Sequence, residues 1–200
     1  MPHFLDPLVI VQTVGLLGVT LIIFAESGLF FGFFLPGDSL LFTAGLVASQ
    51  GHINIVALLF LTFAAAVLGD NVGYWFGARV GPKLFTRERS FIFRPEHIVK
   101  TKAFYERYGK KTIILARFIP IVRTFAPILA GVGAMHYRTF FSYNLIGGAL
   151  WTFGVTLLGY ILGSLILDID RYLLPIIALI IFTSFLPSII EVIRIRRAKE

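Results

Sequence analysis

Two arginines stand inside an otherwise apolar stretch of this sequence. Arg117 and Arg123 lie six positions apart in ARFIPIVRTFAP, residues 116–127, with Pro120 between them. On an unbroken helix the two side chains would point about 120° apart. Pro120 removes a backbone hydrogen bond and bends the turn, which lets both guanidinium groups face one point. Because the guanidinium fork binds phosphate oxygens in pairs, the spacing predicts a phosphate clamp. The alternative is that the arginines only reach the membrane surface or pair with acids for packing.

Two acidic residues in apolar sequence are the expected partners of these arginines. Glu26 lies in FAESGLFFGF and Asp38 in LPGDSLLF, directly after Pro36 and Gly37. A charge at the centre of a bilayer costs about 3 kcal/mol, so buried charges of opposite sign are expected to pair. Burial favours the protonated acid and a nearby arginine favours the carboxylate, so Glu26 and Asp38 are predicted to exchange protons during a transport cycle. The alternative is a fixed salt bridge for Glu26 and a helix N-cap for Asp38.

A third acid, Asp70, lies in LGDNVGYWFGARVG among glycines spaced four residues apart, Gly69, Gly73 and Gly77. Small residues at this spacing let helices approach closely, so a structural or supporting role is expected for this segment. Packing is also the first interpretation of Asn144, Gly147, Gly148 and Trp151 on a later helix. The secondary or structural residues of the predicted site are Asp70, Asn71, Pro36, Gly37, Pro120, Pro127 and Asn144.

The composition excludes an ordinary soluble domain. Hydrophobic residues make up 57% of the chain and charged residues 14%, whereas soluble domains carry about 25% charged residues. Several segments reach about 20 apolar residues, enough to cross a bilayer. We therefore predict a single all-α polytopic transmembrane domain over residues 1–200. Its parts are a transmembrane helix at 8–33, a re-entrant hairpin at 34–50, a transmembrane helix at 53–78, a basic cytoplasmic connector with an amphipathic helix at 79–111, a second re-entrant hairpin at 112–135, a transmembrane helix at 137–167, and a transmembrane helix with a basic tail at 173–197.

The two interrupted segments are expected to enter the membrane from opposite sides. Irregular backbone at membrane depth is tolerated only where protein or a wet cavity satisfies its polar groups, so two such segments imply a shared interior site. The positive-inside rule places the basic connector and the C-terminus in the cytoplasm. The first hairpin then dips in from outside and the second from the cytoplasm. This pattern predicts an inverted repeat in the cytoplasmic (inner) membrane, with the two hairpins facing each other around a midplane site.

The net charge of +7 is concentrated beside the membrane spans. Ten of the eighteen Lys and Arg residues lie between Arg79 and Lys111, and four more close the chain between Arg194 and Lys199. The connector is expected to bind anionic lipids of the inner leaflet through a basic amphipathic helix; a solvated loop is the alternative. Because the basic clusters flank spans, nucleic acid is excluded as a partner.

Enzymatic chemistry finds little support in the sequence. The chain has no cysteine, and His3, His52, His97 and His136 show no metal-ligand spacing. Neither a phosphate-binding Walker loop nor a GxSxG nucleophile motif is present. We therefore expect a protein that is not an enzyme and that holds no metal and no cofactor.

Three motifs together resemble the DedA family, also called the VTT or SNARE-associated-domain family. They are FAESGLFFGFFLPGDSLL, GDNVGYWFGARVG and ARFIPIVRTFAPILAG, and the likeness covers about residues 15–165. The resemblance implies two oppositely oriented re-entrant hairpins, and functional roles for Glu26, Asp38, Arg117 and Arg123. It also implies a link to the return of undecaprenyl phosphate across the cytoplasmic membrane or to phospholipid flipping, with dependence on the proton motive force.

The predicted function is a flippase for a polyprenyl phosphate. Arg117 and Arg123 are expected to clamp the phosphate head, while Glu26 and Asp38 take up protons and pair with the arginines in turn. The alternatives are a phospholipid flippase or scramblase, a proton-coupled antiporter for cations or drugs, and a scaffold that transports nothing. The sequence leaves open which lipid moves, whether movement is coupled, and whether glycine-rich faces form a homodimer.

Overall fold

The computed structural model describes residues 7–29, 35–84 and 111–165. All regular elements in these ranges are α-helices, which confirms the all-α prediction for this part of the chain. The helices are α1 (Pro7–Gly28), α2 (Gly37–Ser49), α3 (Ile55–Leu84), α5 (Lys111–Ala116), α6 (Pro120–Val132) and α7 (Tyr137–Leu165). The predicted amphipathic helix of the connector and the predicted last helix at 173–197 lie outside the described residues.

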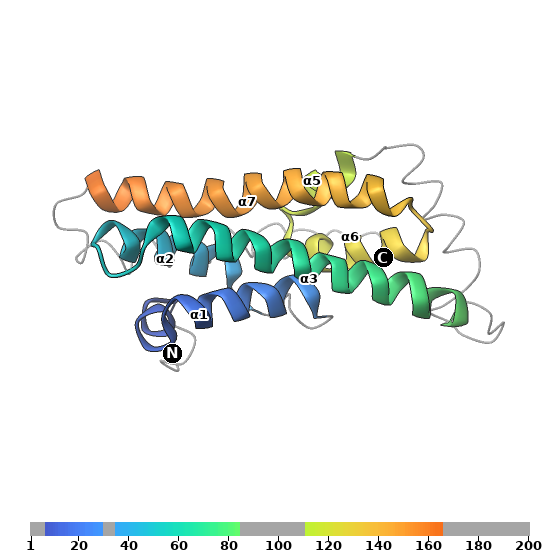
Figure 1. The fold of residues 1–200 in the computed structure, drawn as a ribbon, viewed down its shortest axis with the longest axis horizontal. Helices are drawn as coiled ribbons and strands as arrows, with labels where there is room; N and C mark the ends of the chain where they lie inside the picture. Colours follow the sequence, from blue (N-terminus) through green and yellow to red (C-terminus); the bar gives the residue numbers. More distant parts are fainter. Residues whose placement is uncertain (1–6, 30–34, 85–110, 166–200) are drawn as a thin grey trace, which may run out of the picture.

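The two long helices, α3 and α7, lie side by side and run in opposite directions (Figure 1). Both are long and apolar enough to cross a membrane, over Ile55–Val80 and Tyr137–Leu165. The short α2 packs along the later half of α7, and the short α6 packs along the later half of α3. The short helices α2 and α6 therefore extend toward opposite ends of the molecule, and their first residues meet near its middle.

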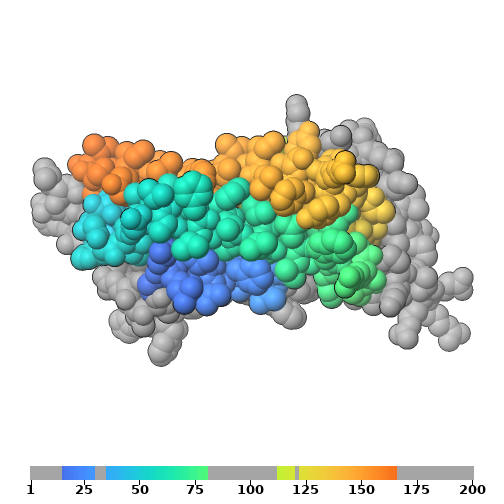
Figure 2. Space-filling model, viewed as in Figure 1, coloured from blue at the N-terminus to red at the C-terminus, as the bar shows by residue number. Residues whose placement is uncertain are grey.

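The helix α1 covers α3 on the side away from α7, so α3 lies between them on the face drawn in Figure 2. The helix begins at Pro7 and ends at Gly28, five residues before the predicted end of the first span. It is not continuous, because Gly15 has φ +59°, a left-handed conformation that glycine adopts without steric cost.

A three-residue break separates α5 from α6. The backbone N–H groups of Arg117, Phe118 and Ile119 bond to carbonyls three residues back, which tightens the end of α5. Pro120 then occupies the start of α6, where its fixed φ suits the first helical turn. Pro127 lies inside α6 and does not end it. The helix therefore breaks over residues 117–119, directly before Pro120, and continues through Pro127.

Glycines allow α2 to approach α7 closely. A Cβ atom at Gly45 would overlap the backbone of Thr156, and one at Gly159 would overlap the backbone of Phe42. The contact is reciprocal. Each helix contributes one glycine, and the backbone that the partner's glycine contacts lies three residues before that glycine. Contact between backbones at this spacing is typical of helix pairs that pack without a hydrophobic driving force, as in lipid.

The crossing of α6 with α3 repeats the same arrangement. A Cβ atom at Gly131 would overlap the backbone of Tyr74, and one at Gly77 would overlap the backbone of Ile128. The glycines again stand three residues from the backbone that the partner contacts. The glycines predicted to allow close packing, Gly69, Gly73 and Gly77, therefore mediate contacts within this chain, where they let α3 pack closely against α1 and α6.

The distribution of polar residues is the reverse of that in a soluble protein. On α3, the polar residues Thr62 and Asp70 are buried, whereas Phe60 and Leu68 are 61% and 58% exposed. On α7, Asn144 is buried and Leu158 is 55% exposed. Exposed apolar faces around buried polar groups are expected where the surrounding medium is hydrocarbon.

Candidate functional site

The first turns of α2 and α6 meet at an ion pair formed by the buried Arg123. Arg123 Nη1, on α6, donates to Asp38 Oδ1, on α2, at 3.0 Å. Arg123 Nη2 donates to Glu26 Oε1, which comes from the last turn of α1. Three elements that are separate in sequence thus place one guanidinium between two carboxyl groups. A Cβ atom at Gly37 would overlap the Glu26 carboxyl group, so glycine at this position lets the carboxyl group lie against the start of α2.

Arg117 follows α5 directly and is held by other partners. Its Nη2 donates to Asp70 Oδ2 and to Asn144 Oδ1, the latter at 2.5 Å. Asp70 lies on α3 and Asn144 on α7, so Arg117 fills the seam between the two long helices. Asn144 is itself oriented by its Nδ2, which donates to the Val67 carbonyl at 3.2 Å.

Glycines on α7 make the space that the Arg117 side chain occupies. A Cβ atom at Gly147 would lie 3.2 Å from Arg117 Cδ, and one at Gly148 would lie 3.6 Å from Arg117 Cζ. A Cβ at Gly147 would crowd the Arg117 side chain, so a larger residue there would displace it, whereas a Cβ at Gly148 would be in ordinary contact with it.

Trp151 connects the two arginines. Its ring centroid lies 4.3 Å from Arg123 Cζ and 5.9 Å from Arg117 Cζ. Its Nε1 donates to Asp38 Oδ1 at 2.6 Å, the same oxygen that accepts from Arg123. The two ion-paired arginines therefore belong to one continuous cluster, which we call the charge cluster: Glu26, Asp38, Asp70, Arg117, Arg123, Asn144 and Trp151.

Burial strengthens the electrostatic interactions among the charged side chains of the charge cluster. Arg117 and Arg123 are each 2% exposed and Glu26 and Asp70 1%, whereas the Asp38 side chain is 24% exposed. Charges removed from water are stable only when paired and hydrogen-bonded, and removing one partner costs about 3–5 kcal/mol. Asp38 is the one acid of the cluster whose side chain reaches the molecular surface. The side of the cluster at Asp38 is therefore the one that a ligand could reach from outside the molecule.

Not every hydrogen-bonding group of the charge cluster has a partner within the described residues. Arg117 Nε and Nη1, Arg123 Nε and Asp70 Oδ1 are buried and form no hydrogen bond there. Unpaired buried donors on a guanidinium are costly, since each loses its bonds to water. Both arginines therefore keep donor capacity for an additional acceptor, and anions with several oxygens are the acceptors that a guanidinium prefers.

The prediction that Glu26 and Asp38 pair with the arginines agrees with the arrangement around Arg123 only. Arg117 pairs with Asp70, which we expected to have a supporting role, because the turn after α5 lies against α7 and directs Arg117 toward α3. The alternative of a helix N-cap for Asp38 is wrong. The N-cap of α2 is Pro36, and the Asp38 carboxyl oxygen accepts from Arg123 and Trp151.

The remaining predicted residues lie around the charge cluster. Asn71 is outside it: its Nδ2 donates to the Val67 carbonyl at 2.7 Å, and its Oδ1 accepts from Tyr137 at 3.1 Å. Pro120 starts α6, and Pro127 packs against Gly73 of α3. Trp151 is the residue that sequence reasoning undervalued. The available signal was its position on one helical face with Asn144 and the two glycines, at spacings of three, four and seven residues.

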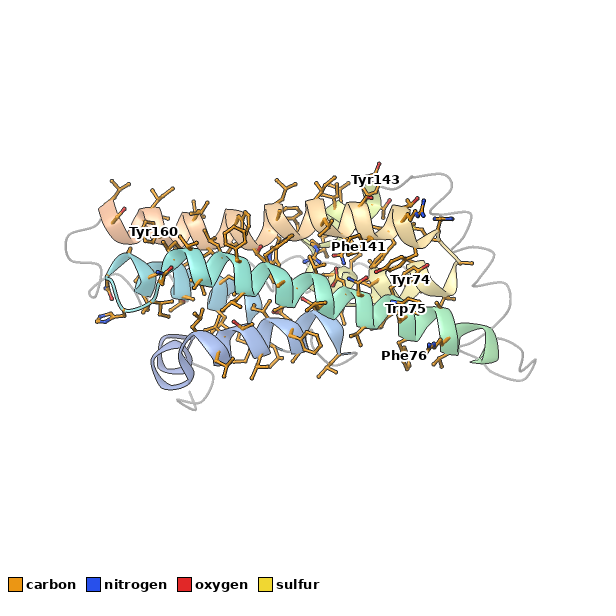
Figure 3. The ribbon with its side chains drawn as sticks, in the orientation of Figure 1. Tyr74, Trp75, Phe76, Phe141, Tyr143 and Tyr160 are labelled. Carbon is orange, nitrogen blue, oxygen red and sulfur yellow. The ribbon has the colours of Figure 1, made fainter. Side chains whose placement is uncertain are left out.

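Aromatic side chains from the later half of α3 and the first turns of α7 lie close together (Figure 3). Tyr74 stacks on Phe140 with ring centroids 4.5 Å apart, and Arg79 lies 5.7 Å from the ring centroid of Trp75. Trp75 is 50% exposed. Exposed aromatic rings beside a basic residue are typical of the boundary between lipid and water.

Comparison with known proteins places the chain in a family. The model of the VTT domain matches residues 35–161. Protein DedA of Escherichia coli K12 is 49% identical over 180 residues, which is 89% of this chain and 82% of that protein. The uncharacterized membrane protein Rv0364 of Mycobacterium tuberculosis H37Rv is 42% identical over 207 residues, 100% of this chain and 90% of that protein.

A more distant relative, the uncharacterized membrane protein slr0232 of Synechocystis, is 31% identical over 66% of this chain and 61% of its own length. No solved structure gives a significant match. The matched region spans the whole charge cluster except Glu26, from the first turn of α2 through most of α7. The chain therefore belongs to the DedA family of VTT-domain membrane proteins.

Proposed function

We propose that this protein is a lipid transporter that moves a phosphorylated lipid, a polyprenyl phosphate such as undecaprenyl phosphate, across the cytoplasmic membrane. The observation that carries the proposal is the burial of Arg117 and Arg123 together where interrupted helices meet. Two guanidinium groups whose donors are not all used within the described residues suit a phosphate, whose oxygens accept several charge-assisted hydrogen bonds. The polyprenyl tail stays in the surrounding lipid.

The two arginines have different roles in this proposal. Arg117 has two nitrogens, Nε and Nη1, with no hydrogen-bond partner among the described residues, and it receives the phosphate first. Arg123 is held by Glu26 and Asp38 and is released when these acids take up protons. Phosphate then replaces the carboxylates as the partner of Arg123, and loss of the protons drives the phosphate off again. Protons are thus the coupling partner and Glu26 and Asp38 the carriers.

The proposed architecture is an inverted repeat with two re-entrant hairpins that face each other. The opposite directions of α2 and α6, and the matching glycine crossings of the two pairs, support it. The first hairpin enters from outside and the second from the cytoplasm, with the connector on anionic lipids and the C-terminus in the cytoplasm. Neither an enzymatic step nor a cofactor is needed.

The test is lipid movement in vesicles reconstituted with the purified protein. An added phosphatase that does not cross the membrane hydrolyses polyprenyl phosphate in the outer leaflet only. Hydrolysis of more lipid than the outer leaflet initially contains therefore reports flipping from the inner leaflet. We expect Arg117→Ala and Arg123→Ala each to slow flipping by about 10- to 100-fold, from the loss of charge-assisted hydrogen bonds. Arg117→Lys keeps the charge and loses the fork, so it should fall between wild type and Arg117→Ala.

The matched control is Arg138→Ala, which removes an exposed arginine of α7 that lies outside the charge cluster. It should flip lipid at the wild-type rate. Flipping by Arg117→Ala and Arg123→Ala at the wild-type rate would refute the clamp. Flipping of labelled phosphatidylethanolamine but not of polyprenyl phosphate would favour a phospholipid flippase, and cation-dependent proton flux without lipid movement would favour an antiporter.

A further inference from the structure

Trp151 is placed by two independent contacts rather than by packing alone. The face of its ring lies against Arg123, with the centroid 4.3 Å from Cζ, and its Nε1 donates to Asp38 at 2.6 Å. The side chain is 1% exposed. A tryptophan that only fills space has no need of both contacts, whereas here the apolar ring and the polar edge each contact a charged group.

The two contacts act on the same ion pair. Asp38 Oδ1 accepts from both Arg123 Nη1 and Trp151 Nε1, so the indole fixes the oxygen to which Arg123 binds. An arginine over an aromatic face is attracted by the ring quadrupole, more strongly when water is excluded. The indole N–H is a donor with no acceptor function, so it can bond the acid but cannot compete with it for Arg123.

The ring is also within 5.9 Å of Arg117 Cζ. Two positive guanidinium groups near each other repel, and a shared aromatic ring offsets part of that repulsion without adding a charge. Trp151 is therefore the side chain through which the Arg123 half of the charge cluster contacts the Arg117 half. It comes from α7, which supplies neither an acid nor a base to the cluster.

We propose that Trp151 is a positioning residue of the head-group site, which holds Arg123 and Asp38 in register and keeps both guanidinium groups ready for one phosphate. This inference rests on the proposed transport function. A phosphate that arrives at a site with Trp151 in place finds Arg123 already oriented. Without Trp151, the lipid must order Arg123 itself, so binding weakens before the maximum rate changes.

The experiment measures flipping against the fraction of polyprenyl phosphate in the vesicles. In Trp151→Leu both contacts are lost, and the half-saturating lipid fraction should rise by about tenfold or more. Trp151→Phe keeps the ring and loses the N–H, so a smaller rise is expected. Phe140→Leu is the control, because Phe140 is buried on the same helix and stacks on Tyr74. It should change the maximum rate at most.

A purely structural role gives a different result, because it lowers the amount of active protein and hence the maximum rate alone. An unchanged half-saturating fraction in Trp151→Leu would overturn the proposal.

A second measurement does not depend on transport. The chain has two tryptophans, so Trp75→Phe leaves Trp151 as the sole source of indole fluorescence. In this background, Asp38→Ala should shift the emission maximum, because the indole N–H loses its hydrogen-bond acceptor, while Phe140→Leu should not. Absence of a shift overturns the inference even if lipid flips. A shift without flipping of polyprenyl phosphate would instead overturn the proposed function and leave the Trp151 contact standing.

Discussion

Asp38 and Arg123, from the first turns of α2 and α6, join the two short helices through a hydrogen bond of 3.0 Å. Each residue lies within a few positions of a proline that starts or precedes its helix, Pro36 or Pro120. The pair therefore lies where the backbone is interrupted in both halves of the chain, and the stability of this junction should depend on its charges.

The two acids on Arg123 should differ in their effect on stability. Glu26→Gln removes a fully buried charge and should destabilise the protein by about 3 kcal/mol. Asp38→Asn should cost less, because this side chain is 24% exposed and an amide oxygen can still accept from Trp151. Thermal unfolding in detergent measures the order, and a larger loss for Asp38→Asn would show that the Asp38 bond is the main one.

Asp70 should matter for transport as much as the predicted acids. Asp70→Asn keeps the shape of the side chain but leaves Arg117 without its carboxylate partner, so flipping should fall by about tenfold or more. Asn71→Ala is the matched control on the same helix, since Asn71 bonds outside the charge cluster. Equal flipping in Asp70→Asn and wild type would mean that Asn144 alone positions Arg117.

The close approach of α2 to α7 should be sensitive to one methyl group. Gly159→Ala places a Cβ against the Phe42 backbone and should destabilise the protein by about 1–3 kcal/mol. Gly154→Ala, on the same helix, meets no atom of the described residues within 4 Å and should be neutral or stabilise the helix by up to about 1 kcal/mol. The free energies of unfolding of the two variants, measured under the same conditions, test this contact. Equal values would mean that α2 and α7 are farther apart than described.

The turns at the two ends of the molecule should face opposite sides of the membrane. His52 and His136 are exposed, in the turn before α3 and the turn before α7, and the chain has no cysteine of its own. In cells, a maleimide that does not cross the membrane should label His52→Cys from outside. It should label His136→Cys only after the membrane is opened. Labelling of both from one side would contradict the inverted repeat.

The sequence was informative where single residues determine local geometry. Pro120 between two arginines predicts a broken helix, and glycines at intervals of four predict close packing, because both effects act within one or two turns. Which acid meets which arginine depends on where separate helices pack in space. Asp70 and Trp151 were therefore undervalued: nothing near them in the chain shows that Arg117 and Asp38 lie beside them.

The make-up of the charge cluster has a consequence for electroneutrality. Arg117 and Arg123 supply two positive charges, whereas Glu26, Asp38 and Asp70 supply three negative charges when all are ionised. The empty site is in balance only when one acid holds a proton. A phosphate monoester carries about 1.5 to 2 negative charges at neutral pH, so in the proposed transport cycle its binding would require further protonation of the acids. If the proposed coupling holds, the number of acids that face the two arginines sets an upper limit on the protons moved per lipid.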